Sequence, residues 1–208
     1  MKINDNKSSE DWISLRSQID KDGENVGLWL AAWDDFFLNR VKSRYLDPIA
    51  LIHDSFHYKG EGFAITTLQC SLVEFIETTV TGEKYVYDNP NKKRFEYNNS
   101  KQKFIGCLTE RLPFKTKFDH VLAKDFYENV RCGLLHEAQT KNNWLIRIDN
   151  KTGIIEERDG HKIFDRFKFG QLLNLFLEKH RTEFVKDKEL QSALRRKLNV
   201  ICDLDILS

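Results

Sequence analysis

An arginine and a histidine, Arg131 and His136, are separated by four residues within a stretch of residues 126–138 that is typical of a helix. Histidine can take up or release a proton near neutral pH. Arginine is a permanent cation whose planar head binds a phosphate through two parallel hydrogen bonds. The pair therefore offers two of the groups that cleavage of a phosphodiester bond requires, one for proton transfer and one for charge stabilisation.

The spacing of the two residues constrains how they can act together. We predict that residues 117–138 form one helix, which we call the motif helix. At about 100° per residue, side chains five positions apart on such a helix point roughly 140° away from each other. Either the helix distorts near Gly133, since glycine is a poor helix former, or a second copy of the chain completes the site. In a two-fold dimer each motif helix can face its own copy.

A purely structural interpretation of the same pair is also open. Arg131 would then form an ion pair with Glu128 or Glu137, which lie three and six positions from it in the sequence. His136 would cap the end of the helix, where a positive charge is favoured. This alternative predicts that neither side chain is available to a substrate.

Further polar residues are candidates for supporting the site. Glu74 and Glu77 lie on a strongly apolar helix expected at residues 63–79, from which they could reach the motif helix and orient Arg131. Asn129 and Glu137 flank the pair on the motif helix itself. The alternative for such residues is that they simply face solvent.

A basic segment could attract a polyanion. The net charge is only +1, but residues 89–118 carry eight basic and two acidic side chains, a local balance of +6. A local positive field attracts nucleic acid whatever the global charge. The alternative is a solvated, lysine-rich loop. The residues that we predict to bind RNA are Lys92, Lys93, Arg94, Lys101 and Lys103.

A metal site is a weaker possibility. His53, His57 and Glu61 recur at four-residue intervals, a spacing that can place metal ligands on one helix face. Gly60 interrupts that helix, and no further strong ligand follows. The sequence also has no glycine-rich phosphate-binding loop and no nucleophile elbow. We therefore expect neither a metal nor a cofactor.

The composition indicates one globular domain. The chain has 208 residues, of which 40% are hydrophobic and 31% charged. We predict a single domain over residues 1–208, with residues 1–10 disordered. The polar N-terminus is unlike a secretion signal, and no apolar run approaches the length of a membrane span. The four scattered cysteines are typical of free thiols. These features favour a cytoplasmic protein that does not associate with membranes.

Apolar periodicity predicts a mainly α-helical bundle. A change to period two at residues 144–148 and 153–157, around a polar turn, predicts a β-hairpin. Phe75, Leu122, Phe126 and Val130 are expected in the core. The helices are expected near residues 12–19, 26–45, 48–58, 63–79, 101–112, 117–138, 165–181 and 186–202.

The residues from Tyr127 to Glu137, with Arg131 and His136 at their centre, resemble the signature of the HEPN superfamily (higher eukaryote and prokaryote nucleotide-binding domains). That signature is an arginine, four to six residues, and a histidine near the end of a bundle helix. The order of helices over about residues 63–181 is compatible with it.

The resemblance implies a HEPN-like helical bundle that forms a homodimer and acts as a metal-independent endoribonuclease on RNA. It implies Arg131 and His136 as the catalytic residues, and a role as a toxin or in antiviral defence. A partner would then be an antitoxin or another regulatory protein. Some members are instead non-catalytic modules that bind nucleotides or proteins and dimerise. The position after the arginine, often polar in the family, is Cys132 here, which favours that second class.

Overall fold

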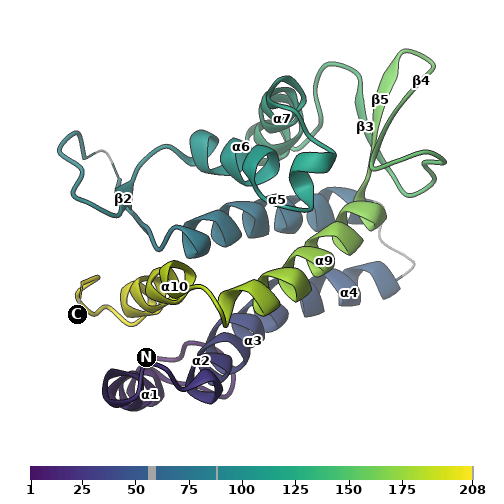
Figure 1. Cartoon of the computed structure of the whole chain (residues 1–208). Coiled ribbons are helices and arrows are strands. Elements are labelled where there is room, and N and C mark those ends of the chain that lie inside the picture. The colour runs from purple at the N-terminus through teal and green to yellow at the C-terminus, as the bar shows by residue number, and fades with distance from the viewer. Residues whose placement is uncertain (56–59, 88, 208) are drawn as a thin grey trace. The chain divides into compact units, whose positions relative to one another are not determined.

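The computed structural model describes residues 1–55, 60–87 and 89–207, and this part of the chain is mainly helical with two small sheets (Figure 1). The chain divides into two compact units, which are described separately. The first comprises residues 1–47, 76–99 and 178–208, and the second comprises residues 48–75 and 100–177. Two helices, α5 (Glu61–Val80) and α9 (Arg166–Phe184), contribute to both. The prediction of a single domain remains a prediction.

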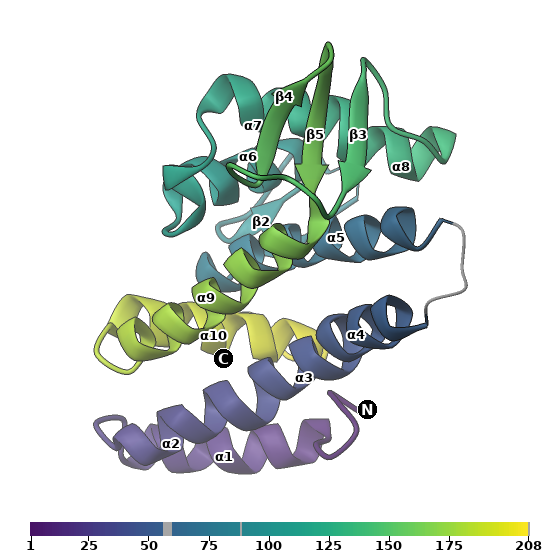
Figure 2. The same cartoon turned by 90° about the vertical axis from the view of Figure 1, so that its right-hand side faces the viewer.

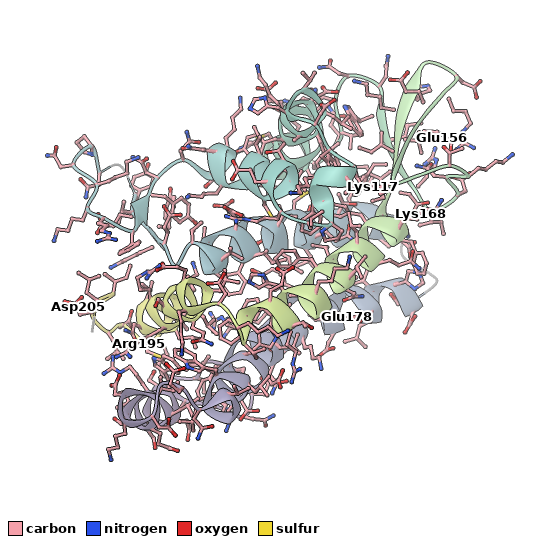
Figure 3. The ribbon with its side chains drawn as sticks, in the orientation of Figure 1. Lys117, Glu156, Lys168, Glu178, Arg195 and Asp205 are labelled. Atoms are coloured by element: carbon pink, nitrogen blue, oxygen red, sulfur yellow. The ribbon has the colours of Figure 1, made fainter. Side chains whose placement is uncertain are left out.

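The first unit is built from helices around a tryptophan-rich core. Trp12 donates its indole N–H to Asn199 Oδ1 at 2.9 Å and packs edge-on against Phe36, with ring centroids 5.6 Å apart. Trp33 packs against Phe184 at 5.1 Å. At the surface, Arg195 of the C-terminal helix, labelled in Figure 3, donates to Asp20 at 2.5 Å. The unit contains α1 (Ser9–Lys21), α2 (Val26–Ala31), η1 (Ala32–Leu38), α3 (Asn39–Val41), η2 (Lys42–Leu46) and α10 (Lys188–Ile201).

The N-terminal residues, for which the sequence predicts disorder, are placed against this unit. Lys2 and Ser8 form an antiparallel bridge, and the Ile3 side chain is fully buried. Asn4 donates to the main-chain carbonyl of Asp35 at 2.6 Å. Ser8 then caps α1 in a reciprocal arrangement with Asp11. The buried side chains of Ile3 and Asn4 thus hold this segment in place.

The expected helix break at Asp47-Pro48 was wrong. The helix that begins at Val26 continues through Pro48 to the end of α4 (Asp47–Asp54). Proline lacks an N–H and clashes with the carbonyl four residues earlier. Here the preceding turn, η2, is π-helical, and such a widened turn moves the hydrogen-bond partner one position further back. The π turn therefore offers a way to accommodate Pro48 without ending the helix.

The second unit has an aromatic core centred on Phe126. Phe126 is fully buried and lies 4.7 Å from Phe164, 5.5 Å from Trp144 and 5.8 Å from Phe118, measured between ring centroids. Phe104 stacks on it at 6.1 Å. Its remaining helices are α6 (Ser100–Glu110), η3 (Phe114–Thr116), α7 (His120–Phe126), η4 (Tyr127–Arg131) and α8 (Cys132–Glu137).

The predicted hairpin was wrong in its pairing. The sheet has three strands, β3 (Trp144–Arg147), β4 (Ile155–Arg158) and β5 (His161–Asp165), and β5 is central (Figure 2). The hairpin joins β4 to β5 through Asp159 and Gly160, which have φ of 53° and 74°. Asp-Gly is the strongest short signal for such a turn. Strand β3 instead pairs with β5 in parallel.

The predicted core is confirmed in part. Phe126 and Val130 are buried, whereas Phe75 and Leu122 are only partly buried. The segment between α5 and α6 contains a short parallel pair, β1 (Lys84–Tyr85) and β2 (Glu96–Tyr97). None of the helices in the described ranges is long and apolar enough to cross a membrane.

Candidate active site

The motif helix is made of three consecutive segments in the second unit, α7, η4 and α8. It begins at His120, slightly later than predicted, where the side chain of Asp119 accepts a hydrogen bond from the N–H of Leu122 at 2.7 Å. Phe126 anchors the first segment in the aromatic core. Arg131 and His136 therefore follow a segment, α7, that is anchored in the core.

The helix distorts in the turn that ends at Arg131, and not near Gly133. The π turn covers Tyr127–Arg131, and α8 is regular from Cys132 to Glu137. The interval from Arg131 to His136 therefore keeps nearly α-helical phase, and the expected divergence of about 140° is retained. A π turn within an α-helix is often found at a functional site.

Arg131 is held by two neighbours on its partly buried side. Its Nη2 lies 3.5 Å from Oε2 of Glu74 on α5, and the two side chains are 19% and 17% exposed. Its guanidinium carbon lies 5.2 Å from the ring centroid of Tyr127, one turn earlier. The carboxylate and the ring together fix the direction of the guanidinium. Tyr127 was missed by the sequence analysis, although an aromatic residue four positions before an arginine on a helix is a usable signal.

Two titratable groups beside Arg131, Tyr127 and Cys70, are neutral at physiological pH. Burial raises the pKa of Tyr127 to about 12; the charge of Arg131 opposes the shift, and a hydrogen bond with Cys132 adds to it. Burial likewise raises the pKa of Cys70 to about 12, against the charge of Arg131. At neutral pH neither group is an anion, so neither can serve as a base or a thiolate nucleophile. The nearby acid that pairs with the guanidinium is Glu74.

The ion pairs proposed in the structural alternative for Arg131 were wrong. Glu128 pairs instead with Lys101 at 2.6 Å, and Glu137 pairs with Lys141 at 3.2 Å. Glu74 is the acid that lies beside Arg131, as its place on the apolar helix suggested. Whether Glu74 orients Arg131 for catalysis stays a prediction.

His136 projects from the last turn of α8 and is exposed. Within the described ranges it forms no hydrogen bond or ion pair. The end of the helix is closed by the main chain, because the N–H groups of Ala138 and Gln139 both donate to the carbonyl of Gly133. Ala138 adopts the left-handed conformation common at helix ends, with φ of 53°. His136 is therefore not needed as a cap.

Gly133 is required by the chain that returns after the helix. A Cβ at this position would lie 2.4 Å from the carbonyl oxygen of Gln139. The close approach lets residues 139–142 fold back along the motif helix, where the N–H of Lys141 donates to the carbonyl of Asn129 at 2.9 Å. Gly133 therefore shapes the exit of the helix and not the direction of Arg131.

Asn129 belongs to a separate polar network. Its amide donates to Asp125 at 2.5 Å and accepts from Asn142 at 2.8 Å. Asp125 also accepts from Lys162 of β5 at 2.6 Å. Burial acts to raise the pKa of Asp125, but the hydrogen bonds from Lys162 and Asn129 outweigh it, so the pKa is lowered. The network fastens the motif helix to the sheet.

The other predicted site residues are divided between the two units. Glu77 is 4% exposed and belongs to the first unit. Lys92, Lys93 and Arg94 are exposed in the first unit, whereas Lys101 and Lys103 lie on α6 of the second. Lys101 is partly neutralised by Glu128. The two groups of basic residues are thus on separate units.

The metal interpretation can be examined only in part. The His53 ring is tilted against that of Phe167, with centroids 5.8 Å apart, and its Nδ1 lies 3.4 Å from Oδ1 of Asp54. His57 is outside the described residues. Glu61 pairs with Arg166. In the part of the chain that the structure describes, no three metal-ligating side chains come together.

No family model matches the chain, and no curated protein or solved structure matches it.

Proposed function

We propose that the chain is a homodimeric, metal-independent endoribonuclease of the HEPN type, with Arg131 and His136 as its catalytic residues. The proposal includes a cytoplasmic role as a toxin or defence protein, under the control of a second protein. The observation that carries it is the contrast between the two residues. Arg131 is fixed by Glu74 and Tyr127, while His136 is exposed at the helix end with no partner in the described chain.

The reaction uses the 2′-hydroxyl of RNA as its nucleophile. A histidine removes the proton of the 2′-hydroxyl, the 2′ oxygen bonds to phosphorus, and the bond from phosphorus to the 5′ oxygen breaks. A second histidine protonates the leaving 5′ oxygen. The products are a 2′,3′-cyclic phosphate and a 5′-hydroxyl. Each chain supplies one His136, so two copies provide the base and the acid.

Arg131 would stabilise the charge that builds on the phosphoryl oxygens. An arginine keeps its charge at all working pH values and presents five donors in a plane. The single pairing with Glu74, at the long distance of 3.5 Å, leaves donors for a phosphate. Because the Arg131 and His136 side chains diverge on one helix, the proposal requires a second copy of the chain to complete the site.

The test is RNA cleavage in the presence of a chelator. We expect the purified protein to cut single-stranded RNA in EDTA and to leave 2′,3′-cyclic phosphate ends, detected by mass spectrometry. His136→Ala should abolish cleavage, and Arg131→Ala should lower its rate by about 100-fold or more. His120→Ala changes another exposed histidine of the motif helix and should leave the rate unchanged.

The competing function is a non-catalytic binding module. Cys132 favours it, because the position after Arg131 carries a thiol that is engaged with Tyr127. RNA or nucleotide binding without cleavage by the wild type would establish this alternative and reject the ribonuclease. Normal cleavage by His136→Ala would reject the proposed site.

A further inference from the structure

Two arginines of the first unit are stacked on one phenylalanine ring. The Cζ atoms of Arg94 and Arg196 lie 4.7 Å and 3.9 Å from the ring centroid of Phe95. Phe95 itself has φ of 65°, an unusual conformation for an aromatic residue. We call Arg94, Phe95 and Arg196 the arginine clamp. It joins the loop of residues 81–99 to α10.

The positive charge of the clamp is not neutralised by a direct partner in the described chain. Arg196 donates to the main-chain carbonyl of Thr81 at 3.2 Å, and neither guanidinium has an ion pair there. Burial lowers the pKa of Arg196; Glu189 opposes this shift, and the nearby charge of Arg94 adds to it. Two like charges held beside one ring favour an anion, and guanidinium groups suit a phosphate best.

Exposed aromatic side chains lie next to the clamp. The N–H of Lys84 donates to the carbonyl of Phe95 at 2.9 Å, so β1 runs directly beside it. Tyr85 is 48% exposed and Tyr87 is 85% exposed. Tyr87 lies two residues further along the chain, in the turn that follows β1. The ring of Tyr85 is supported edge-on by Tyr97, with centroids 5.4 Å apart.

We propose that Tyr85, Tyr87 and the arginine clamp bind single-stranded RNA, with phosphates at the arginines and bases stacked on the tyrosines. Positively charged grooves combined with aromatic side chains bind single strands because every base has a face to stack. The bases of a duplex are already stacked on each other, so the tyrosines discriminate against it. Exposed Lys92 and Lys93 extend the positive surface. The choice of RNA as the nucleic acid rests on the proposed ribonuclease function.

Binding is measured on the full chain with His136→Ala, so that cleavage does not interfere. The probe is a fluorescently labelled 20-nucleotide oligouridylate, titrated by anisotropy at several salt concentrations, with a duplex RNA of equal length in parallel. We expect tighter binding to the single strand. Tyr87→Ala should weaken it about tenfold, the scale of one lost stacking contact. Arg94→Gln should weaken it and lower the salt slope by about 0.7, the value for one phosphate contact on a single strand.

The control variant, Lys21→Gln with Lys42→Gln, removes two exposed positive charges from other elements of the same unit. It should leave the affinity nearly unchanged.

Arg196→Gln is a second test of the clamp, to be interpreted only if its circular dichroism matches the parent, because Arg196 also packs against Gly82 and Phe95. Equal affinity for single strand and duplex, or no effect of both Tyr87→Ala and Arg94→Gln, would overturn the proposal. Displacement of the labelled RNA by polyglutamate as readily as by unlabelled oligouridylate would also overturn it, because that result indicates a surface for anions in general or for acidic proteins.

The two proposals can fail separately. A wild type that binds oligouridylate through these residues but never cuts it leaves the binding surface standing and rejects the ribonuclease. If the wild type cuts RNA, and Tyr87→Ala and Arg94→Gln bind and cut RNA as well as the wild type does, the binding surface is rejected and the ribonuclease proposal is retained. A dinucleotide substrate, which has only the two nucleotides that flank the scissile phosphate, should be cut equally by the wild type and by Tyr87→Ala.

Discussion

Arg131 and His136 occupy opposite environments although they belong to one short segment. Arg131 is 19% exposed between a carboxylate and an aromatic ring, and His136 is exposed at the helix end. Glu74 is the residue that most directly sets the orientation of the guanidinium. A catalytic role for the arginine therefore predicts a measurable role for its partner.

Glu74→Gln should lower the rate of RNA cleavage between about tenfold and 100-fold, because small displacements of a catalytic group are costly. The effect should appear in kcat, with KM little changed, since Glu74 positions the guanidinium and does not touch the substrate. Glu128→Gln breaks the surface pair with Lys101 and is the matched control. Equal rates for the two variants would show that Glu74 has no positioning role.

Asp125 links the motif helix to β5 through Lys162, and its lowered pKa makes this link depend on pH. A carboxylate whose pKa is lower in the folded state stabilises the fold above its unfolded pKa, about 3.9. That contribution is lost as the pH falls through the folded pKa. Asp125→Asn should therefore cost about 1 kcal/mol of unfolding free energy at pH 7.

The difference between the wild type and Asp125→Asn should shrink below about pH 4, which urea denaturation at pH 7 and at pH 3 can test. Asp149→Asn is the control, because the pair of Asp149 with Arg158 is more exposed and longer, at 3.4 Å. It should cost less at pH 7. A constant difference for Asp125→Asn at both pH values would argue against the ion pair.

At the scale of elements, packing contacts on both sides of Arg131 fix the position of the motif helix. Phe126 fixes the helix in the aromatic core, and the returning chain packs closely on Gly133. The π turn between these anchors places Tyr127 and Cys132 in hydrogen-bond contact. The helix is thus held at both ends of the segment that carries Arg131.

Gly133→Ala tests the return of the chain. Alanine is the better helix former, so propensity alone predicts a gain in stability. We expect instead a loss of about 1–3 kcal/mol, because the added Cβ would meet the carbonyl of Gln139 at 2.4 Å. Thermal or chemical denaturation measures the difference. Gly23→Ala, whose Cβ would make an ordinary contact at 3.4 Å, should be nearly neutral, and similar results for both would refute the packing argument.

At the scale of the whole molecule, the divergence of Arg131 and His136 makes the proposed site incomplete in one chain. The exposed side of α8 also carries Leu135, which is 50% exposed next to His136. An apolar side chain beside a proposed catalytic residue suits an interface with a second copy. We therefore expect a two-fold homodimer with the motif helix at its interface.

Leu135→Glu should convert the dimer into a monomer and reduce RNA cleavage, without changing the circular dichroism spectrum. Sedimentation equilibrium at tens of micromolar measures the association. Ile148→Glu replaces an apolar side chain of similar exposure, 55%, and should leave the dimer intact. A wild type that is monomeric under these conditions would contradict the composite site.

The sequence alone predicts the helical character, most helix positions, and the burial of Phe126 and Val130, because these follow from apolar residues at three- and four-residue intervals. It also identifies Glu74 as a residue able to reach Arg131. The π turns, the passage of a helix through Pro48, and the parallel pairing of β3 with β5 are decided by the tertiary structure. The pairing of β3 with β5 depends on contacts between segments distant in the sequence, and local periodicity encodes neither this pairing nor the π turns. The partner of Arg131 shows this most clearly, because proximity in the sequence suggested Glu128 or Glu137. Those two residues pair instead with Lys101 and Lys141. The packing of α5 against the motif helix places Glu74 beside Arg131.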